Sequence, residues 1–214
     1  MSYIDVTYEV CATPWHVQQK LREMNQYPEL SFDCETRGVY SKAQRKEAVQ
    51  FLKKEGTAQE HRQLALLVAN NSGLSFPSLV NVTHFIFGIS ENHSIILIAN
   101  YPQEEIQIWN WIARYEGMLY IHNTLFDLKL MYHRVRTFPQ RYEDTQLLVK
   151  SFVNHVNVWK AKVGLKDLMG AYYHPEWALA VDYEPVNLKE PKFLMYGGID
   201  GAATFKLARN IEEH

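Results

Sequence analysis

Two carboxylates, Asp33 and Glu35, stand two residues apart directly after the apolar residues Leu30 and Phe32. Because residues i and i+2 of a β-strand project to the same face, a strand here places both carboxylates side by side and turns Cys34 to the opposite face. Two such charges about 4 Å apart repel by about 4 kcal/mol at an effective dielectric constant of about 20. A divalent cation removes this repulsion, and hard oxygen ligands suit Mg²⁺ or Mn²⁺. The pair therefore indicates a metal site, with a strand end whose acids face water as the alternative.

A second polar pair, Asn123 and Asp127, follows a short apolar segment at 118–121 and opens a helical pattern. The spacing of four residues places both side chains on the same side of the first helical turns. Open α/β sheets place their binding sites at this carboxyl end of a strand. An Asp near a helix N-terminus is also common as a cap and because it interacts favourably with the helix dipole. Both interpretations stay open for this pair.

Tyr196 and Asp200 are likewise four residues apart, on one face of a helix that we expect to begin at Pro191. Three glycines at 197–201 interrupt this helical pattern. Each glycine costs a helix about 0.8–1 kcal/mol relative to alanine. Close approach of the helix to the sheet or to a substrate backbone would explain them. The alternative is that the helix breaks at the first two glycines and that Asp200 is a plain cap.

In this order, the three pairs resemble the motifs of the 3′–5′ exonuclease superfamily named for its four acids, in the branch with a tyrosine before the last acid (DEDDy). The proofreading exonuclease domain of bacterial DNA polymerase I and ribonuclease D have the most similar pattern. The resemblance spans nearly the whole chain, since segments 13–15, 87–90 and 165–168 are similar to the family's lead-in helix, its second strand and the segment ahead of its third motif. Met195 stands where the histidine branch has its histidine.

The resemblance implies a ribonuclease H-like fold, an α/β mixed sheet with helices on both faces, and two-metal hydrolysis of a phosphodiester. It implies that two divalent cations, Mg²⁺ or Mn²⁺, are held by Asp33, Glu35, Asp127 and Asp200. Tyr196 would orient the attacking water, and Thr36 and Asn123 would hold the terminal nucleotide. The products would be nucleoside 5′-monophosphates.

The implied substrate is the 3′ end of DNA, single-stranded or frayed, and the enzyme would process DNA ends or proofread for a separate DNA polymerase. Trimming of RNA 3′ ends in the manner of ribonuclease D is the first alternative, ranked lower because no helical accessory domain is evident in the sequence. The second alternative is a non-catalytic module of the same fold that binds nucleic acid or a protein. Four intact acids that repel one another argue against such a module.

The chain has 214 residues, 47% of them hydrophobic and 21% charged, which is typical of a soluble globular protein. Its net charge of −2 does not point to a nucleic-acid partner, but a metal site or a local basic cluster supplies positive charge. Cys11 and Cys34 match neither a disulfide framework nor a zinc site. No segment has the about 20 apolar residues needed to span a bilayer, and the N-terminus shows no secretory signal. We therefore expect a cytoplasmic protein without membrane contact.

Basic residues concentrate in one segment, where seven Lys or Arg residues stand against three Glu between Arg37 and Arg62. We expect an insert at about 37–81 of a single domain (1–214), with helices at 42–56 and 57–68. Contact with substrate phosphates or a merely solvated helical face would each explain the charges of Lys42, Arg45 and Lys46.

Apolar alternation and apolar runs predict strands at 3–10, 30–36, 82–90, 94–99, 118–121 and around Tyr142. The early strands include an expected hairpin, and the later ones alternate with helices, which suggests one mixed sheet. We expect Asp144 to cap a helix. The remaining polar and aromatic candidates are interpreted as packing residues, namely His122, His133, Trp109, Trp111, Trp159 and Trp177.

Overall fold

The structure, a computed structural model, describes residues 5–38, 42–53, 59–69, 77–154, 163–178 and 187–212. The strands in these ranges are β1 (Thr7–Cys11), β2 (Glu29–Gly38), β3 (Val80–Ser90), β4 (His93–Ile98), β5 (Met118–Ile121) and β6 (Tyr142–Asp144). The helices are α1 (Pro14–Met24), α2 (Lys42–Leu52), α3 (Gln59–Ala69), α4 (Pro102–Arg114), α5 (Leu125–Val135), α6 (Thr145–Asn154), α7 (Leu165–Tyr172) and α8 (Pro191–Glu212). None of these helices is long and apolar enough to cross a bilayer.

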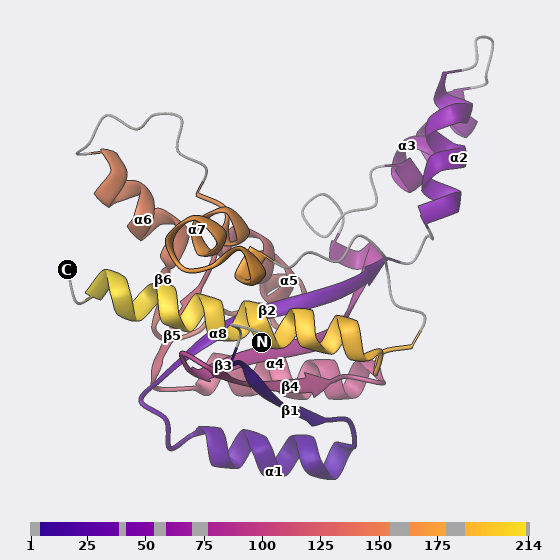
Figure 1. Cartoon of the computed structure of the whole chain (residues 1–214). Coiled ribbons are helices and arrows are strands. Elements are labelled where there is room, and N and C mark those ends of the chain that lie inside the picture. The colour runs from indigo at the N-terminus through magenta and orange to yellow at the C-terminus, as the bar shows by residue number, and fades with distance from the viewer. Residues whose placement is uncertain are drawn as a thin grey trace.

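The six strands form one mixed sheet in the order β1-β4-β3-β2-β5-β6 (Figure 1). β3 pairs antiparallel with both β2 and β4, whereas the β1–β4, β2–β5 and β5–β6 pairs are parallel. The hairpin expected between the third and fourth strands is present, with its turn at residues 91–92. Helices α1 and α4 cover one face of the sheet and α8 covers the other (Figure 1). The predicted α/β architecture is therefore confirmed.

The helices begin at the signals that the sequence carries. Thr13 caps α1, since its Oγ1 accepts a hydrogen bond from the His16 amide at 3.3 Å. At α4, the buried Glu104 carboxylate accepts hydrogen bonds from the Asn100 and Tyr101 amides at 2.7 and 3.3 Å. These bonds satisfy amides that a helix and its lead-in leave unpaired, so both helices start where the sequence predicts.

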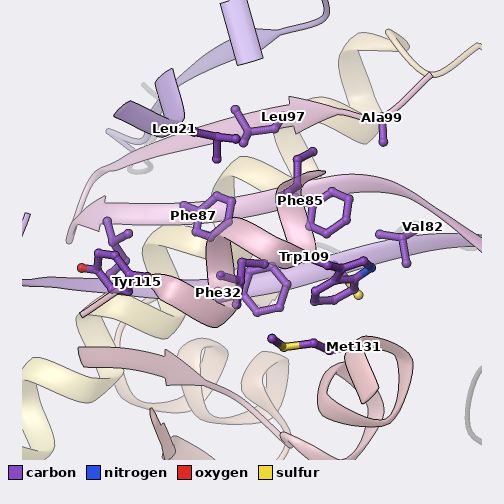
Figure 2. Close-up of a cluster of buried hydrophobic side chains, with 14 of the residues drawn as sticks. Leu21, Phe32, Val82, Phe85, Phe87, Leu97, Ala99, Trp109, Tyr115 and Met131 are labelled. Carbon is purple, nitrogen blue, oxygen red and sulfur yellow. The ribbon is translucent and has the colours of Figure 1, made fainter. Parts of the chain in front are cut away.

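The larger hydrophobic core lies between one face of the sheet and helices α1, α4 and α5 (Figure 2). Its centre is aromatic: the ring of the fully buried Trp109 lies 4.8 Å from that of Phe85 and 5.7 Å from that of Phe32, edge-on in both cases. Cys34, the residue between the two acids of β2, turns into this core as predicted. β2 therefore buries one face in the core and carries its acids on the other.

Helix α8 lies so close to the other face of the sheet that backbone touches backbone. A methyl group added at Gly88 of β3 would overlap the carbonyl oxygen of Gly201. The buried Ser31 hydroxyl donates to that carbonyl at 2.6 Å and accepts from the Gly88 amide at 3.0 Å. Ser94 likewise donates to the Gly198 carbonyl at 2.8 Å. Close approach to the sheet is therefore what the glycines permit, and α8 continues through them without a break.

Helices α2 and α3 form a hairpin that projects away from the sheet (Figure 1). The strands extend into the segment expected to be an insert, because Arg37 and Gly38 pair with Asn81 and Val80. Helix α2 ends at Leu52 and is therefore shorter than the helix expected at 42–56, although residues 54–58 lie outside the described part of the chain. In the sequence the hairpin therefore lies between the paired ends of β2 and β3.

We expect Gly88→Ala to destabilise the protein by about 1–3 kcal/mol, because the added methyl group must displace backbone atoms of α8. Gly197→Ala is the control, since its methyl group would first meet the flexible end of the Ile86 side chain, at 2.8 Å. Alanine at that position also gains up to about 1 kcal/mol of helix propensity. Urea denaturation compares the two, and equal stabilities would show that the backbone contact imposes no constraint.

Candidate active site

A cavity of about 300 Å³ lies beside the middle of β2 and is walled by β2, α5, α7 and α8. It contains the four predicted acids, the predicted tyrosine and the predicted asparagine, namely Asp33, Glu35, Asn123, Asp127, Tyr196 and Asp200. Residues that the motifs did not single out as site residues also line it, among them His122, Phe126, Leu165, Lys166 and Thr204. Segments far apart in the sequence therefore converge on one pocket.

Three of the carboxylates form a tight group: oxygens of Asp33, Glu35 and Asp200 lie within 4.8 Å of one another. Asp33 and Glu35 share one side of β2 because strand residues alternate. The glycine contact of α8 with β3 brings Asp200 up to them. Tyr196 precedes Asp200 by one helical turn, and its hydroxyl donates a hydrogen bond to the Glu35 carboxylate. The two residues predicted to share a face of the strand therefore meet the two predicted to share a face of the helix.

Asp127 adds a fourth carboxylate from the first turn of α5. It is 2% exposed, and its Oδ1 accepts a hydrogen bond from the Cys34 amide at 3.2 Å. That amide is available because the pairing of β2 with β5 ends two residues earlier, at Phe32 and Ile121. The bond holds Asp127 in the cavity, next to the tight group of three carboxylates but outside it.

Asn123 connects β5 to α5 in a left-handed conformation, with φ of 65°. Asparagine tolerates this conformation better than most residues, so its identity has a structural reason beside the predicted functional one. The Asp144 carboxylate accepts hydrogen bonds from the Asn123 and Thr124 amides at 3.2 and 2.9 Å. It also caps α6 through the Gln146 amide at 2.8 Å, as predicted. Asp144 therefore stabilises the wall that carries Asn123 and Asp127.

Lys166, in the first turn of α7, is a charged wall residue to which the motifs assign no role. Its ammonium group forms an ion pair with Asp200 and lies 4.2 Å from the centre of the Tyr196 ring. Burial lowers the pKa of Lys166 to about 8, although the charges of Asp33 and Glu35 act in the opposite direction. A signal was present in the sequence, because a lysine in the first turn of a helix opposes the helix dipole and calls for another partner.

The acids together carry more negative charge than the protein compensates. Burial raises the pKa of Asp33 to about 6, against the opposing charge of Lys166. Burial and the neighbouring Asp33 raise the pKa of Glu35 to about 8. Burial and Asp33 also raise the pKa of Asp127. Near neutral pH the site therefore retains protons when no cation is bound, and a cation that binds must release them.

Burial and the charges of Glu35 and Asp33 raise the pKa of Tyr196 above its usual value of 10.0. The phenol therefore stays protonated at neutral pH. A protonated phenol can donate a hydrogen bond in this site and is not suited to act as a base.

The wall residues fit a divalent cation. Carboxylate oxygens are the hard ligands that Mg²⁺ and Mn²⁺ prefer, and three of them lie within 4.8 Å of one another. The buried Thr204 hydroxyl, one turn after Asp200, has no hydrogen-bond partner in the described part of the structure. A hydrated ion would supply that partner. The donor set, the uncompensated charge and the unpaired hydroxyl all suit a hydrated Mg²⁺ or Mn²⁺ ion.

The remaining predicted binding residues whose side chains the structure describes do not line this cavity. Thr36 follows a register shift in β2 and pairs with Val82 of β3. Arg45 and Lys46 lie on α2, within the projecting hairpin. The side chain of Lys42 falls outside the described part of the structure. Of the basic residues expected to flank the acid cavity, Arg45 and Lys46 therefore lie away from its wall.

His122 borders the cavity, but protein groups occupy both of its ring nitrogens. Its Nδ1 lies 2.9 Å from the Thr145 hydroxyl, and its Nε2 lies 3.0 Å from the Val163 carbonyl oxygen. An imidazole with both nitrogens engaged is not a metal ligand, so the structural role predicted for His122 is confirmed.

The sequence matches no protein-family model, and no curated protein sequence matches it. Its fold is similar to that of Brucella melitensis NrnC, at 12% identity and a TM-score of 0.58 over 97% of this chain and 80% of that chain. Trypanosoma brucei RNase D in complex with RNA U12 is similar at 11% identity and a TM-score of 0.60, over 99% of this chain and 64% of that chain. The catalytic core of Trypanosoma brucei RRP6 is similar at 8% identity and a TM-score of 0.62, over 100% of this chain and 48% of that chain. NrnC structures with bound Mg²⁺ and bound to pGG are also similar.

Identities of 8–13% show the fold of the chain. The mixed six-stranded sheet with helices on both faces is the ribonuclease H-like fold of these proteins, as predicted. The finer similarity to the proofreading domain of DNA polymerase I rests on the sequence motifs alone.

Glu35→Gln should stabilise the metal-free protein, because it removes one of the repelling buried carboxylates. The folded protein holds the Glu35 proton up to a pKa of about 8, against 4.5 for an ordinary glutamate. The folded state therefore binds more protons than the unfolded state between these values, and wild-type stability falls as pH rises through this window. We expect a gain of about 1–3 kcal/mol for Glu35→Gln at pH 8 and little gain at pH 5.

Urea denaturation in EDTA at both pH values measures this difference. Glu116→Gln is the control, because Glu116 is exposed on the loop between α4 and β5, and it should change stability by less than about 0.5 kcal/mol at either pH. A gain for Glu35→Gln that is the same at pH 5 and pH 8 would contradict the proposed repulsion.

Proposed function

We propose that this protein is a divalent-cation-dependent 3′–5′ exonuclease that removes nucleoside 5′-monophosphates from the 3′ end of RNA. The observation that carries the proposal is the convergence of Asp33, Glu35 and Asp200 within 4.8 Å, with Asp127 and Tyr196 in the same cavity. The repulsion in this group gives it a reason to bind cations, and the fold is one found in known exonucleases.

In this mechanism the carboxylates of Asp33, Glu35, Asp127 and Asp200 would hold two divalent cations. These cations would supply Lewis acidity for an in-line displacement at the phosphodiester. The chain's own residues fix the geometry: β2 presents one pair of carboxylates, and α8 presents the third across the glycine contact with the sheet. Asp127 presents the fourth through its hydrogen bond to the Cys34 amide.

Tyr196 orients the attacking water. Its hydroxyl already lies against Glu35, and its raised pKa keeps it protonated as a donor. Asn123 lies in the cavity wall, from which its side chain would hold the terminal nucleotide. Thr36 would contact the substrate only beyond the cavity, because it is paired within the sheet next to β3.

RNA is favoured over the DNA expected from the motifs because of what the similar folds bind. One structure of RNase D holds RNA U12, and NrnC has been solved bound to pGG. The DNA substrate and the separate polymerase rest on the sequence resemblance alone. A reducing compartment such as the cytoplasm suits the protein, because Cys11 and Cys34 are buried free thiols.

Matched RNA and DNA oligonucleotides labelled at the 5′ end test the activity. With Mg²⁺ the wild type should shorten RNA stepwise from the 3′ end, and EDTA should stop the reaction. Replacing both Asp33 and Glu35 with alanine should reduce the rate by more than about 100-fold, beyond the loss typical of residues that only support metal ligands. Glu116→Ala, at an exposed site, should retain the wild-type rate.

Each other outcome identifies an alternative. Faster shortening of DNA than of RNA would restore the DNA substrate. Binding of oligonucleotides without shortening in Mg²⁺ or Mn²⁺ would identify a non-catalytic module. A double variant that digests as fast as the wild type would refute the metal-ligand assignment.

The basic residues of the α2–α3 hairpin are a proposed second contact with nucleic acid. Arg45 is partly exposed and Lys46 is exposed on α2. In the sequence the hairpin lies between the paired ends of the two strands β2 and β3, of which β2 also carries Asp33 and Glu35. A single strand that leaves the cavity along this side would meet these charges, and phosphate contacts of this kind weaken as salt rises.

Replacing both Arg45 and Lys46 with alanine should make RNA binding less dependent on salt. Each lost phosphate contact reduces the slope of log K against log salt by about 0.7 for a single strand, so we expect a change of about 1.4. Binding of fluorescein-labelled RNA at four KCl concentrations measures the slope, with Ca²⁺ in place of Mg²⁺. Arg22→Ala with Arg114→Ala removes two exposed charges from α1 and α4 and should leave it unchanged. Equal slopes for both double variants would reject the contact.

A further inference from the structure

Lys166 places a positive charge inside the acid cavity. Its ammonium group forms an ion pair with Asp200 and lies 4.2 Å from the centre of the Tyr196 ring. The charges of Asp33 and Glu35 also act on this group. Lys166 therefore interacts with the same carboxylates that would ligate a cation.

Helix α7 itself does not favour a lysine at this position. Lys166 lies in the first turn, where the helix dipole is positive, and its side chain is only 28% exposed. A partly buried ammonium group costs free energy unless it is paired. The acids of the cavity therefore account for the lysine, which neutralises part of their charge in the absence of a metal ion.

The backbone of α7 is held by the buried face of the helix. Met169 packs in a cluster with Ile199 and Ala202 of α8, and Leu168 packs in a second cluster with Leu207 of the same helix. Lysine has a flexible four-carbon stem. Its ammonium group can therefore leave Asp200 by rotation of the stem while α7 keeps its place.

We propose that Lys166 is a tethered competitor of the divalent cation, bound to Asp200 in the metal-free protein and displaced when a metal ion takes that carboxylate. The inference rests on the metal site of the proposed function. Two cations next to one carboxylate repel each other, so the Lys166–Asp200 pair must open before the ion gains its full ligand set. Lys166 thereby weakens metal binding while it stabilises the site without metal.

Calorimetric titration with Mn²⁺, at one pH and without nucleic acid, tests this role. Lys166→Met removes the charge and keeps most of the length of the stem. We expect the variant to bind Mn²⁺ at least about fivefold more tightly than the wild type, the lower end of usual coupling between linked sites. Lys166→Gln should give the same result and guards against a folding defect of one variant.

Lys206→Met is the matched control. Lys206 also pairs with an acid, Glu91 at 2.7 Å, and lies 5.2 Å from the centre of the Tyr173 ring. Its side chain is 25% exposed, close to the value for Lys166, but it borders a different cavity. Loss of this charge should leave the Mn²⁺ affinity within about twofold of the wild type, as for independent sites.

The outcomes separate this inference from the proposed function. Equal or weaker Mn²⁺ binding by both Lys166 variants, with the wild type still binding, overturns the competitor role and leaves the exonuclease assignment intact. A wild type that binds no Mn²⁺ overturns both. Failure of the proposed function alone has another signature, in which Mn²⁺ binding tightens in the variants but no oligonucleotide is shortened.

Discussion

The contact between the backbones of α8 and β3 is the constraint on which the site depends. At Gly88 and Gly201 neither element has a side chain, and the Ser31 hydroxyl joins both to β2 with two hydrogen bonds. This contact sets the position of Asp200, because Asp200 is the residue directly before Gly201. Asp33 stands two residues after Ser31 on the same face of β2. One buried polar contact therefore fixes the separation between carboxylates that are distant in sequence.

The site that results is unfavourable for the folded chain by itself. Burial raises the pKa of Asp33, Glu35 and Asp127, and the charge of Asp33 raises the pKa of the other two further. The Lys166 ammonium group offsets only part of the negative charge. The opposite face of the same strand supplies the compensation, since it packs Phe32 against the buried ring of Trp109. β2 thus joins an aromatic part of the core to the acidic cavity.

Periodicity carried most of what the sequence could predict. The two-residue spacing of Asp33 and Glu35 placed them on one face. The cost of the α8 glycines suggested close approach to the sheet or to a substrate backbone, and the structure shows the approach to the sheet. Lys166 could not be found this way, because it meets Asp200 through tertiary contact between two helices and belongs to no repeat. The extension of β2 past Thr36 was also missed, since its pairing with β3 follows a register shift that local pattern does not reveal.

The carboxylates of the site are held on rigid elements, whereas the lysine that pairs with them ends a flexible side chain. The acids stand on the central strand, on the first turn of α5 and on the long helix α8, where packing or backbone hydrogen bonds leave little freedom. The one described ammonium group in the cavity wall instead ends a flexible stem on the short helix α7. A metal site needs ligands that the surrounding structure holds in place, and these elements hold the carboxylates in that way. If Lys166 leaves Asp200 as we propose, its departure would change the charge of the pocket without changing its shape.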